Sequence, residues 1–169
     1  ALEIHTRLGN LLAQARALNM LGNIHRQLGR MEQALDYYQR SLAIKAQVGD
    51  KTGEAATLYN LAVYYHTEGN LAAALRCCDQ SLVISRLVGS LRIQAYALTY
   101  LALLLEERLA AGVPGSSPAD LHTAHEYYAQ ALAIRRQIHQ LPLALDCMAG
   151  LGRASLGLGN LEEAQRWVQ

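Results

Sequence analysis

The sequence has few charged residues and no long apolar run, and both shortages exclude functions. Only 17% of the 169 residues are charged and the formal net charge is +1, which argues against a nucleic-acid partner because nucleic-acid-binding domains usually carry a basic excess. No run of about eighteen uncharged apolar residues occurs, so a transmembrane helix is excluded. The first residues form neither a signal peptide nor a transit peptide. Three cysteines, two of them adjacent, favour a reducing compartment. We therefore expect a cytoplasmic protein without membrane contact.

What is present points to helices, and the chain repeats itself. Leu and Ala make up about a third of the residues, and few β-branched residues are available to build sheets. Two series of small residues recur every 40 residues, with one step of 50 in each. They are Gly22, Ala62, Ala102 and Gly152, and then Ala34, Ala74, Ala124 and Ala164. The ten extra residues lie near 109–118, where Gly, Pro and Ser predict a mobile surface loop.

Each 40-residue unit is predicted to form two helices. Apolar residues recur at helical spacing in both halves of a unit, and each run is followed by a residue that can end a helix in the left-handed conformation. In the first half of the first unit, the residues expected on one packing face are Leu18, Leu21, Ile24 and His25. The predicted stops are Gly9, Gly29, Gly49, Gly69, Gly89 and Gly159, with His139 at the corresponding place in the third unit. The predicted N-caps of the second helices are Asn70, Asp120 and Asn160.

The units divide the chain into one array with incomplete ends. The expected division is 1–14 as the end of a preceding repeat, 15–54 as repeat I, 55–94 as repeat II, 95–144 as repeat III with the insertion near 109–118, and 145–169 as a truncated repeat IV. No capping repeat is visible, so we expect a fragment of a larger bacterial signalling or regulatory protein. Self-association is expected through the apolar residues at the cut end, which are Leu161, Ala164, Trp167 and Val168.

The order of large and small residues is specific. In the first unit it comprises Leu18, Leu21, Gly22, His25, Gly29, Ala34, Tyr38 and Ser41, and the other three units repeat it. This pattern resembles the tetratricopeptide repeat, although the period is longer than the usual 34 residues. The longer period resembles the subgroup seen in kinesin light chains, Pins-like adaptors and bacterial signalling ATPases and transcription regulators. The resemblance implies an all-α fold, a right-handed α-solenoid of antiparallel helix pairs with a concave surface.

The resemblance also implies which residues line that concave groove. The matching positions are Arg16, Asn19, Asn23, Arg26 and Gln27, then Tyr59, Asn60, Val63 and His66, then Tyr96, Thr99, Tyr100, Leu103 and Glu107, and finally Asp146, Ala149 and Arg153. The candidate site comprises Arg16, Asn19, Asn23, Arg26, Tyr59, Asn60, Val63, Tyr96, Thr99, Tyr100 and Arg153. Asn amides can donate to and accept from a peptide backbone, and Tyr supplies amphipathic contact area. The alternative is that these are ordinary polar residues on exposed helix faces.

Other conspicuous residues favour structural roles. One tyrosine of each adjacent pair falls at a packing position. Arg135 with Arg136 is expected either on a solvated face or as a charge at a helix C-terminus that complements the helix dipole. His122 and His125 could place two metal ligands on one helix face, but no further cluster accompanies them, so no metal site is predicted. The chain contains no P-loop, dinucleotide fingerprint, Gly-x-Ser-x-Gly or His-Glu-x-x-His motif. We predict neither catalysis nor a cofactor.

Two functions of different classes remain. The leading hypothesis is a protein–protein interaction scaffold whose groove binds a peptide or helix, from a partner or from the parent chain. The alternative is a regulatory sensor domain that binds a small-molecule effector and controls an attached ATPase or DNA-binding domain. In the first case the acidic end of the bound segment is expected near Arg16 and Arg26, away from Glu106 and Glu107.

Overall fold

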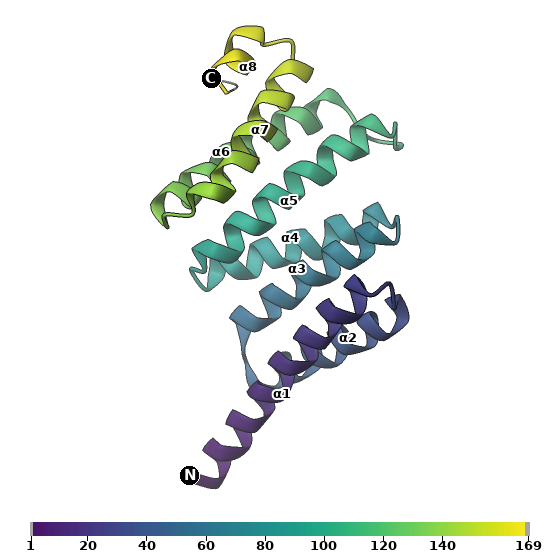
Figure 1. Cartoon of the computed structure of the whole chain (residues 1–169), viewed down its shortest axis with the longest axis vertical. Coiled ribbons are helices and arrows are strands. Elements are labelled where there is room, and N and C mark those ends of the chain that lie inside the picture. The colour runs from purple at the N-terminus through teal and green to yellow at the C-terminus, as the bar shows by residue number, and fades with distance from the viewer. Residues whose placement is uncertain (1, 168–169) are drawn as a thin grey trace. The chain divides into compact units, whose positions relative to one another are not determined.

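The computed structural model describes the backbone of residues 2–167 and the side chains of residues 9–167. This part of the chain forms eight helices and no strand (Figure 1). Unit 1 (residues 1–89) and unit 2 (residues 90–169) are each compact. Unit 1 contains α1 (Leu2–Gln27), α2 (Met31–Val48), α3 (Lys51–Thr67) and α4 (Leu71–Leu87). Unit 2 contains α5 (Leu91–Ala110), α6 (Pro118–Gln137), α7 (Leu141–Gly157) and α8 (Leu161–Arg166). None of the described helices is both long and apolar enough to cross a membrane.

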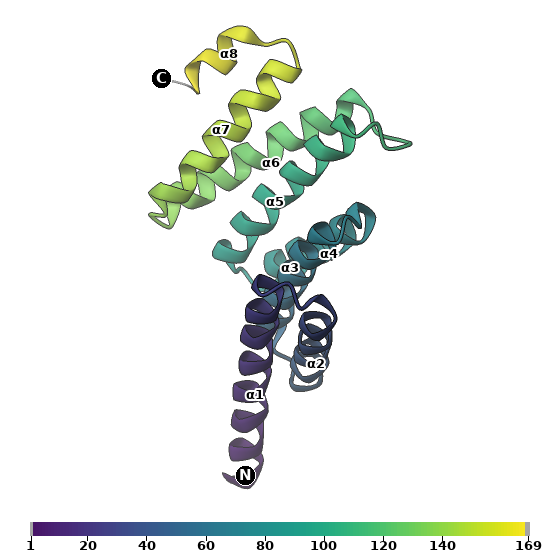
Figure 2. The same ribbon diagram turned by 45° about the vertical axis from the view of Figure 1, so that its right-hand side comes forward.

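The 40-residue period is a period of structure as well as of sequence. In unit 1, α2 packs against α1 and α4 against α3, and in unit 2, α6 packs between α5 and α7 (Figure 2). Two buried serines make the same hydrogen bond 40 residues apart. Ser41 Oγ donates to the carbonyl oxygen of Ala15, and Ser81 Oγ donates to that of Ala55, both at 2.7 Å. Each second helix of unit 1 is thus fastened to its first helix at the same register.

Left-handed residues end the helices at most of the predicted places. Gly29, Gly49, Gly69, Gly89 and Gly159 all have φ between 70° and 78°, as predicted. His139 takes the corresponding place before α7 with φ of 56°, a conformation that residues with a side chain rarely adopt. The predicted caps Asn70 and Asn160 are confirmed, because their side chains accept hydrogen bonds from the backbone N–H groups of Ala73 and Glu163.

Two predicted helix boundaries are wrong. The helix α1 runs without a break from Leu2 to Gln27, so Gly9 ends no helix. A glycine inside a helix is unfavourable by only about 1 kcal/mol, which a helix of this length can absorb. Asp120 is not an N-cap, because α6 begins at Pro118 with Ser117 as its cap. The division of the chain into repeats, with 1–14 as part of a preceding one, stays a prediction.

The extra residues of the third unit lengthen two helices as well as a loop. The helices α5 and α6 have 20 residues each, whereas α3 and α4 have 17. Asp120 accepts from the backbone N–H of Ser117 at 3.2 Å and from Nε of Arg108 at 3.1 Å. This ion pair between the end of α5 and the first turn of α6 closes the base of the loop.

Tyrosine rings packed on glycines set the spacing of the helices. A Cβ added to Gly22 of α1 would lie 2.5 Å from the ring of Tyr38 on α2. In unit 2, a Cβ on Gly150 of α7 would lie 2.5 Å from the ring of Tyr128 on α6. Both tyrosines are almost completely buried. Gly152, which the sequence pattern equates with Gly22, is not a close-contact position, since its nearest neighbour would be 3.6 Å away.

Some residues predicted at packing positions are exposed. Leu21 and Ile24 are 38% and 48% exposed, because α1 packs on its neighbours through the face that carries Leu18 and Gly22 instead. At the C-terminal edge, Leu161 is exposed, Ala164 is buried and Trp167 is half-buried. Val168 lies outside the described residues, and the expected self-association stays a prediction.

Replacing Gly22 by Ala should destabilise unit 1, because the new Cβ would force the buried ring of Tyr38 to move. We expect the free energy of unfolding to fall by about 1–3 kcal/mol in urea denaturation. Gly152→Ala is the matched control. It has room for a Cβ and gains helix propensity, so it should be neutral or stabilising by up to about 1 kcal/mol. Equal stabilities of the two variants would contradict the packing described here.

Replacing Asp120 by Ala should remove both the contact with the Ser117 N–H and the ion pair with Arg108. Because Asp120 is largely buried, we expect a loss of about 1–3 kcal/mol in the free energy of unfolding. Glu126→Ala removes an exposed carboxylate from the same helix and should change stability by less than about 0.5 kcal/mol. Thermal unfolding followed by circular dichroism measures the stability of both variants. An Asp120→Ala variant as stable as the control would show that the contacts of Asp120 with Arg108 and Ser117 do not stabilise the base of the loop.

Candidate functional site

A hollow of about 290 Å³ opens in unit 2 where three helices meet. It is lined by Thr99, Tyr100 and Leu103 of α5, Tyr128 of α6, and Asp146, Ala149 and Arg153 of α7. We call it the α5–α7 pocket. The three α7 residues follow the spacing i, i+3 and i+7, so they share one face of that helix. Six of the seven lining residues belong to the set that the sequence assigned to a groove, and these six lie together.

A tyrosine at the base of the pocket organises two charged residues. The hydroxyl of Tyr128 donates to Oε2 of Glu106 at 2.9 Å, and Nη2 of Arg153 donates to the same carboxylate at 3.0 Å and to the hydroxyl at 3.2 Å. Burial and the negative charge of Glu106 raise the pKa of Tyr128, and Arg153 only partly opposes them. The phenol therefore stays protonated. Because Arg153 pairs with Glu106, that carboxylate is not the open acidic end of the groove that the sequence suggested.

Arg135 of α6, which was not among the candidate residues, supports the α5 side of the pocket. Both arginines lie in the last turn of α6, which confirms the expected charge at a helix C-terminus. Arg136 is exposed, but Arg135 is only 2% exposed, so a solvated position is wrong for Arg135. Its guanidinium lies 5.0 Å from the ring centre of Tyr96 and donates to Oγ1 of Thr99 at 3.3 Å. A second nitrogen donates to Oε1 of Gln140, also at 3.3 Å, and Nε has no hydrogen-bond partner. Arg135 positions two candidate groove residues.

In unit 1, several candidate residues bind one another or the core. Asn60 Nδ2 donates to Oδ1 of Asn19 at 3.1 Å, which joins α3 to α1. The hydroxyl of Tyr38 donates to Oδ1 of Asn23 at 2.7 Å. Burial raises the pKa of Tyr38, and the neighbouring Arg26 opposes this shift. Asn23 is therefore the acceptor of a buried phenol and contributes to folding, in contrast to the free surface amide that the sequence suggested.

A buried lysine lies beside the candidate residue Arg16. Lys45 at the end of α2 is 3% exposed, and its Nζ donates to Oγ1 of Thr57 on α3 at 2.7 Å. Burial lowers the pKa of Lys45, Asp50 opposes this effect and Arg16 adds to it. Arg16 itself is exposed, whereas the remaining candidates of unit 1, Tyr59 and Val63, are half-buried on α3. Lys45 and Arg135 are 90 residues apart in the sequence, which equals two periods plus the ten-residue insertion. The basic residues thus occupy corresponding positions of two repeats, and this recurrence is the feature of the sequence that could have indicated a shared role.

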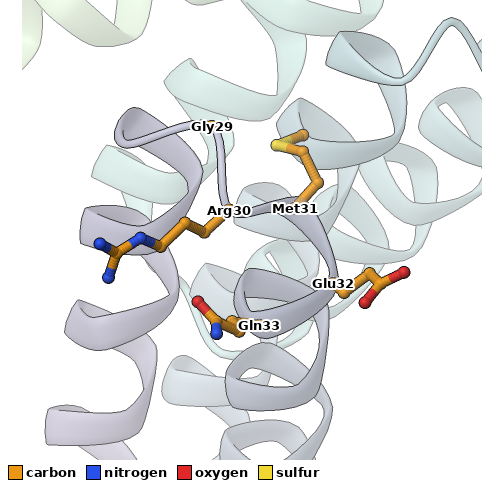
Figure 3. A pocket seen from close by; sticks show the side chains of 5 residues that line it. All are labelled: Gly29, Arg30, Met31, Glu32 and Gln33. Atoms are coloured by element: carbon orange, nitrogen blue, oxygen red, sulfur yellow. The ribbon is translucent and has the colours of Figure 1, made fainter.

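Other surface features of the described residues do not converge on a site. A hollow of about 450 Å³ at the turn between α1 and α2 is lined by Gly29, Arg30, Met31, Glu32 and Gln33 (Figure 3). Figure 3 shows the side chains of Arg30 and Glu32 pointing to opposite sides of this turn. In unit 2, Nε2 of His125 lies 3.1 Å from Oε1 of Glu163. Among the side chains described, no three His, Cys, Asp or Glu residues are arranged to hold a metal ion.

Replacing Lys45 by Met should leave unit 1 as stable or more stable at pH 7, by about 1 kcal/mol, because it removes a buried charge. Thr57 keeps its hydrogen bond to the carbonyl oxygen of Gly53. Since burial lowers the pKa of Lys45, the protonated amine disfavours the folded state below that lowered pKa, and this penalty disappears as the pH approaches 10.5. Urea unfolding of both proteins between pH 7 and 10.5 should therefore show a shrinking advantage of the variant. A constant difference would contradict this account.

Comparisons with known proteins agree with the helical repeats. Family models described as tetratricopeptide repeat match residues 1–47 and 55–89. No curated protein matches the sequence significantly. Among solved structures, BtubC (BKLC) from P. vanneervenii superimposes with a TM-score of 0.76 at 20% identity, covering 91% of this chain and 60% of that one. The chain thus spans less than two thirds of that relative's length.

Two further solved structures have the same fold. A Podosopora anserina protein described as a kinesin light chain with nearly identical TPR-like repeats has a TM-score of 0.71 at 20% identity, covering 93% of this chain and 72% of that one. MamA has a TM-score of 0.52 at 15% identity, covering 92% and 88%. The expected fold class, an all-α solenoid of antiparallel helix pairs, is confirmed, while the 40-residue subgroup stays a prediction. The chain belongs to the tetratricopeptide-repeat family.

Proposed function

We propose that this chain is a protein–protein interaction scaffold and that the α5–α7 pocket receives part of a peptide or helix from its partner. Membership of the tetratricopeptide-repeat family and the solenoid fold support the scaffold role. One observation carries the choice of site. Six groove positions, which the resemblance to the tetratricopeptide repeat implies on two different helices, line a single hollow. The proposal involves no catalytic step.

The walls of the pocket suit the side chains of a peptide. Tyr100, Leu103 and Ala149 offer apolar and aromatic surface, while the carboxylate of Asp146 offers polar atoms beside it. The walls are also held in place before any partner arrives. Tyr128 and Glu106 fix Arg153, and Arg135 holds Thr99. Such preorganisation favours binding, because less side-chain freedom is lost when the partner docks.

Unit 1 carries its own candidate contacts for another part of the partner. These are Arg16, Asn19, Tyr59, Asn60 and Val63, since Asn23 and Arg26 serve Tyr38. We further propose that the chain is part of a larger bacterial signalling or regulatory protein, whose other segments are among the possible occupants of the groove. Its expected location is the cytoplasm.

A substitution that fills the pocket tests the proposed site. Ala149 is exposed and lines the pocket, so Ala149→Trp should block it without disturbing the core. Peptides selected from a displayed random library on the original protein should bind the Ala149→Trp variant at least tenfold more weakly, as measured by fluorescence polarisation. The expected loss corresponds to about 1.4 kcal/mol or more.

Ala133→Trp is the matched control, because Ala133 is exposed on α6 of the same unit and does not line the pocket. Its peptide affinities should equal those of the original protein, and both variants should keep the original melting temperature. Selected peptides that bind the Ala149→Trp variant with full affinity would place the binding surface elsewhere. A library that yields no binding peptides would count against the scaffold role itself.

A further inference from the structure

Four charged side chains lie in or directly behind the walls of the α5–α7 pocket, and three of them are already engaged. Arg153 and Glu106 pair with each other at 3.0 Å. Arg135 is 98% shielded from solvent, and its terminal nitrogens donate to Thr99 and Gln140. The charges of Arg153 and Glu106 offset each other, although the Arg153 side chain is 54% exposed, and Arg135 is too deeply buried to meet a ligand.

Asp146 is the exception. It is exposed, it lines the pocket, and no hydrogen bond or ion pair of its carboxylate is found in the described part of the chain. Ala149 and Arg153 follow it on the same face of α7, so the carboxylate lies at one end of the hollow. A negative charge at the mouth of a partly enclosed site attracts a cation, and the low polarity of the walls strengthens that attraction.

The remaining walls suit the rest of a basic side chain. Leu103 and Ala149 can contact the aliphatic stem of an arginine or lysine. The ring of Tyr100 offers an aromatic face, a surface that cations favour. An acidic side chain would meet the unpaired carboxylate of Asp146, and the Arg153 guanidinium that could attract it is already paired with Glu106.

We infer that the α5–α7 pocket binds the side chain of an arginine or lysine from the partner segment, with its cationic head paired to the carboxylate of Asp146. This inference rests on the proposed function, because it names the residue type that the groove selects. The charges of Arg16 and Arg26 suggested only how the bound segment is oriented, with its acidic end near unit 1. The carboxylate of Asp146 adds a preference for one type of side chain in unit 2.

Small probes test this charge selection without a known partner. The probes are N-acetyl-arginine amide, N-acetyl-citrulline amide, which has a similar shape without the charge, and N-acetyl-glutamate amide. We expect the arginine probe to cause saturable shifts of the amide resonances of Tyr100 and Ala149 in two-dimensional NMR at millimolar concentration. Citrulline should bind about fivefold more weakly, the scale of one exposed ion pair, and glutamate should cause no saturable shift.

Three variants separate the charge of Asp146 from general effects. Asp146→Asn should weaken the arginine probe to the citrulline level, while Asp79→Asn, the same change at an exposed position on α4, should leave binding unchanged. Asp146→Lys should reverse the preference in favour of glutamate. Equal binding of arginine and citrulline, preference of the original protein for glutamate, or no saturable arginine binding would each overturn the inference. Selected peptides blocked by Ala149→Trp would still support the proposed function, so the two failures can be told apart.

Discussion

The packing of a tyrosine ring against a glycine is the contact on which the other features depend. Tyr38 lies on Gly22 in unit 1 and Tyr128 lies on Gly150 in unit 2, in each case with no space for a Cβ. The ring fills the space between helices, and the hydroxyl emerges on the side of the candidate groove. There it binds Asn23 in unit 1, and Glu106 and Arg153 in unit 2. Core packing therefore fixes the positions of polar groove side chains.

Buried cations make a second connection between core and groove. Lys45 and Arg135 occupy corresponding positions of two repeats, and both donate to a threonine hydroxyl. A buried charge that meets only neutral acceptors contributes little to stability and can reduce it. What the contacts of these cations do show is the order that each cation imposes on its neighbours. Arg135 holds Tyr96 and Thr99 in one arrangement, which is what a binding wall requires.

Periodicity explains how much of this architecture could be predicted from the sequence. The period and the helix-ending glycines follow from the geometry of repeated helices, and the positions facing the pocket follow from the resemblance to the tetratricopeptide repeat. Features that depend on one particular contact within the chain could not be predicted. Gly9 continues a helix, Arg135 is buried, and Asn23 is bound to a phenol, because each depends on one contact that a repeat pattern does not encode. The start of α6 at Pro118, before the predicted cap Asp120, could have been predicted, because Ser followed by Pro is a common beginning of a helix.

The clamp between Arg108 and Asp120 has a consequence for protein engineering. It joins the two ends of the α5–α6 connection without using any residue between Gly112 and Ser116. Chain entropy is then the main cost of a longer loop, and each doubling of a flexible loop costs about 0.6 kcal/mol. Foreign sequence, such as an epitope or a fluorescent domain, can therefore be spliced into this segment while both helices keep their ends. The chain thus offers a labelling point that leaves the lining of the pocket intact.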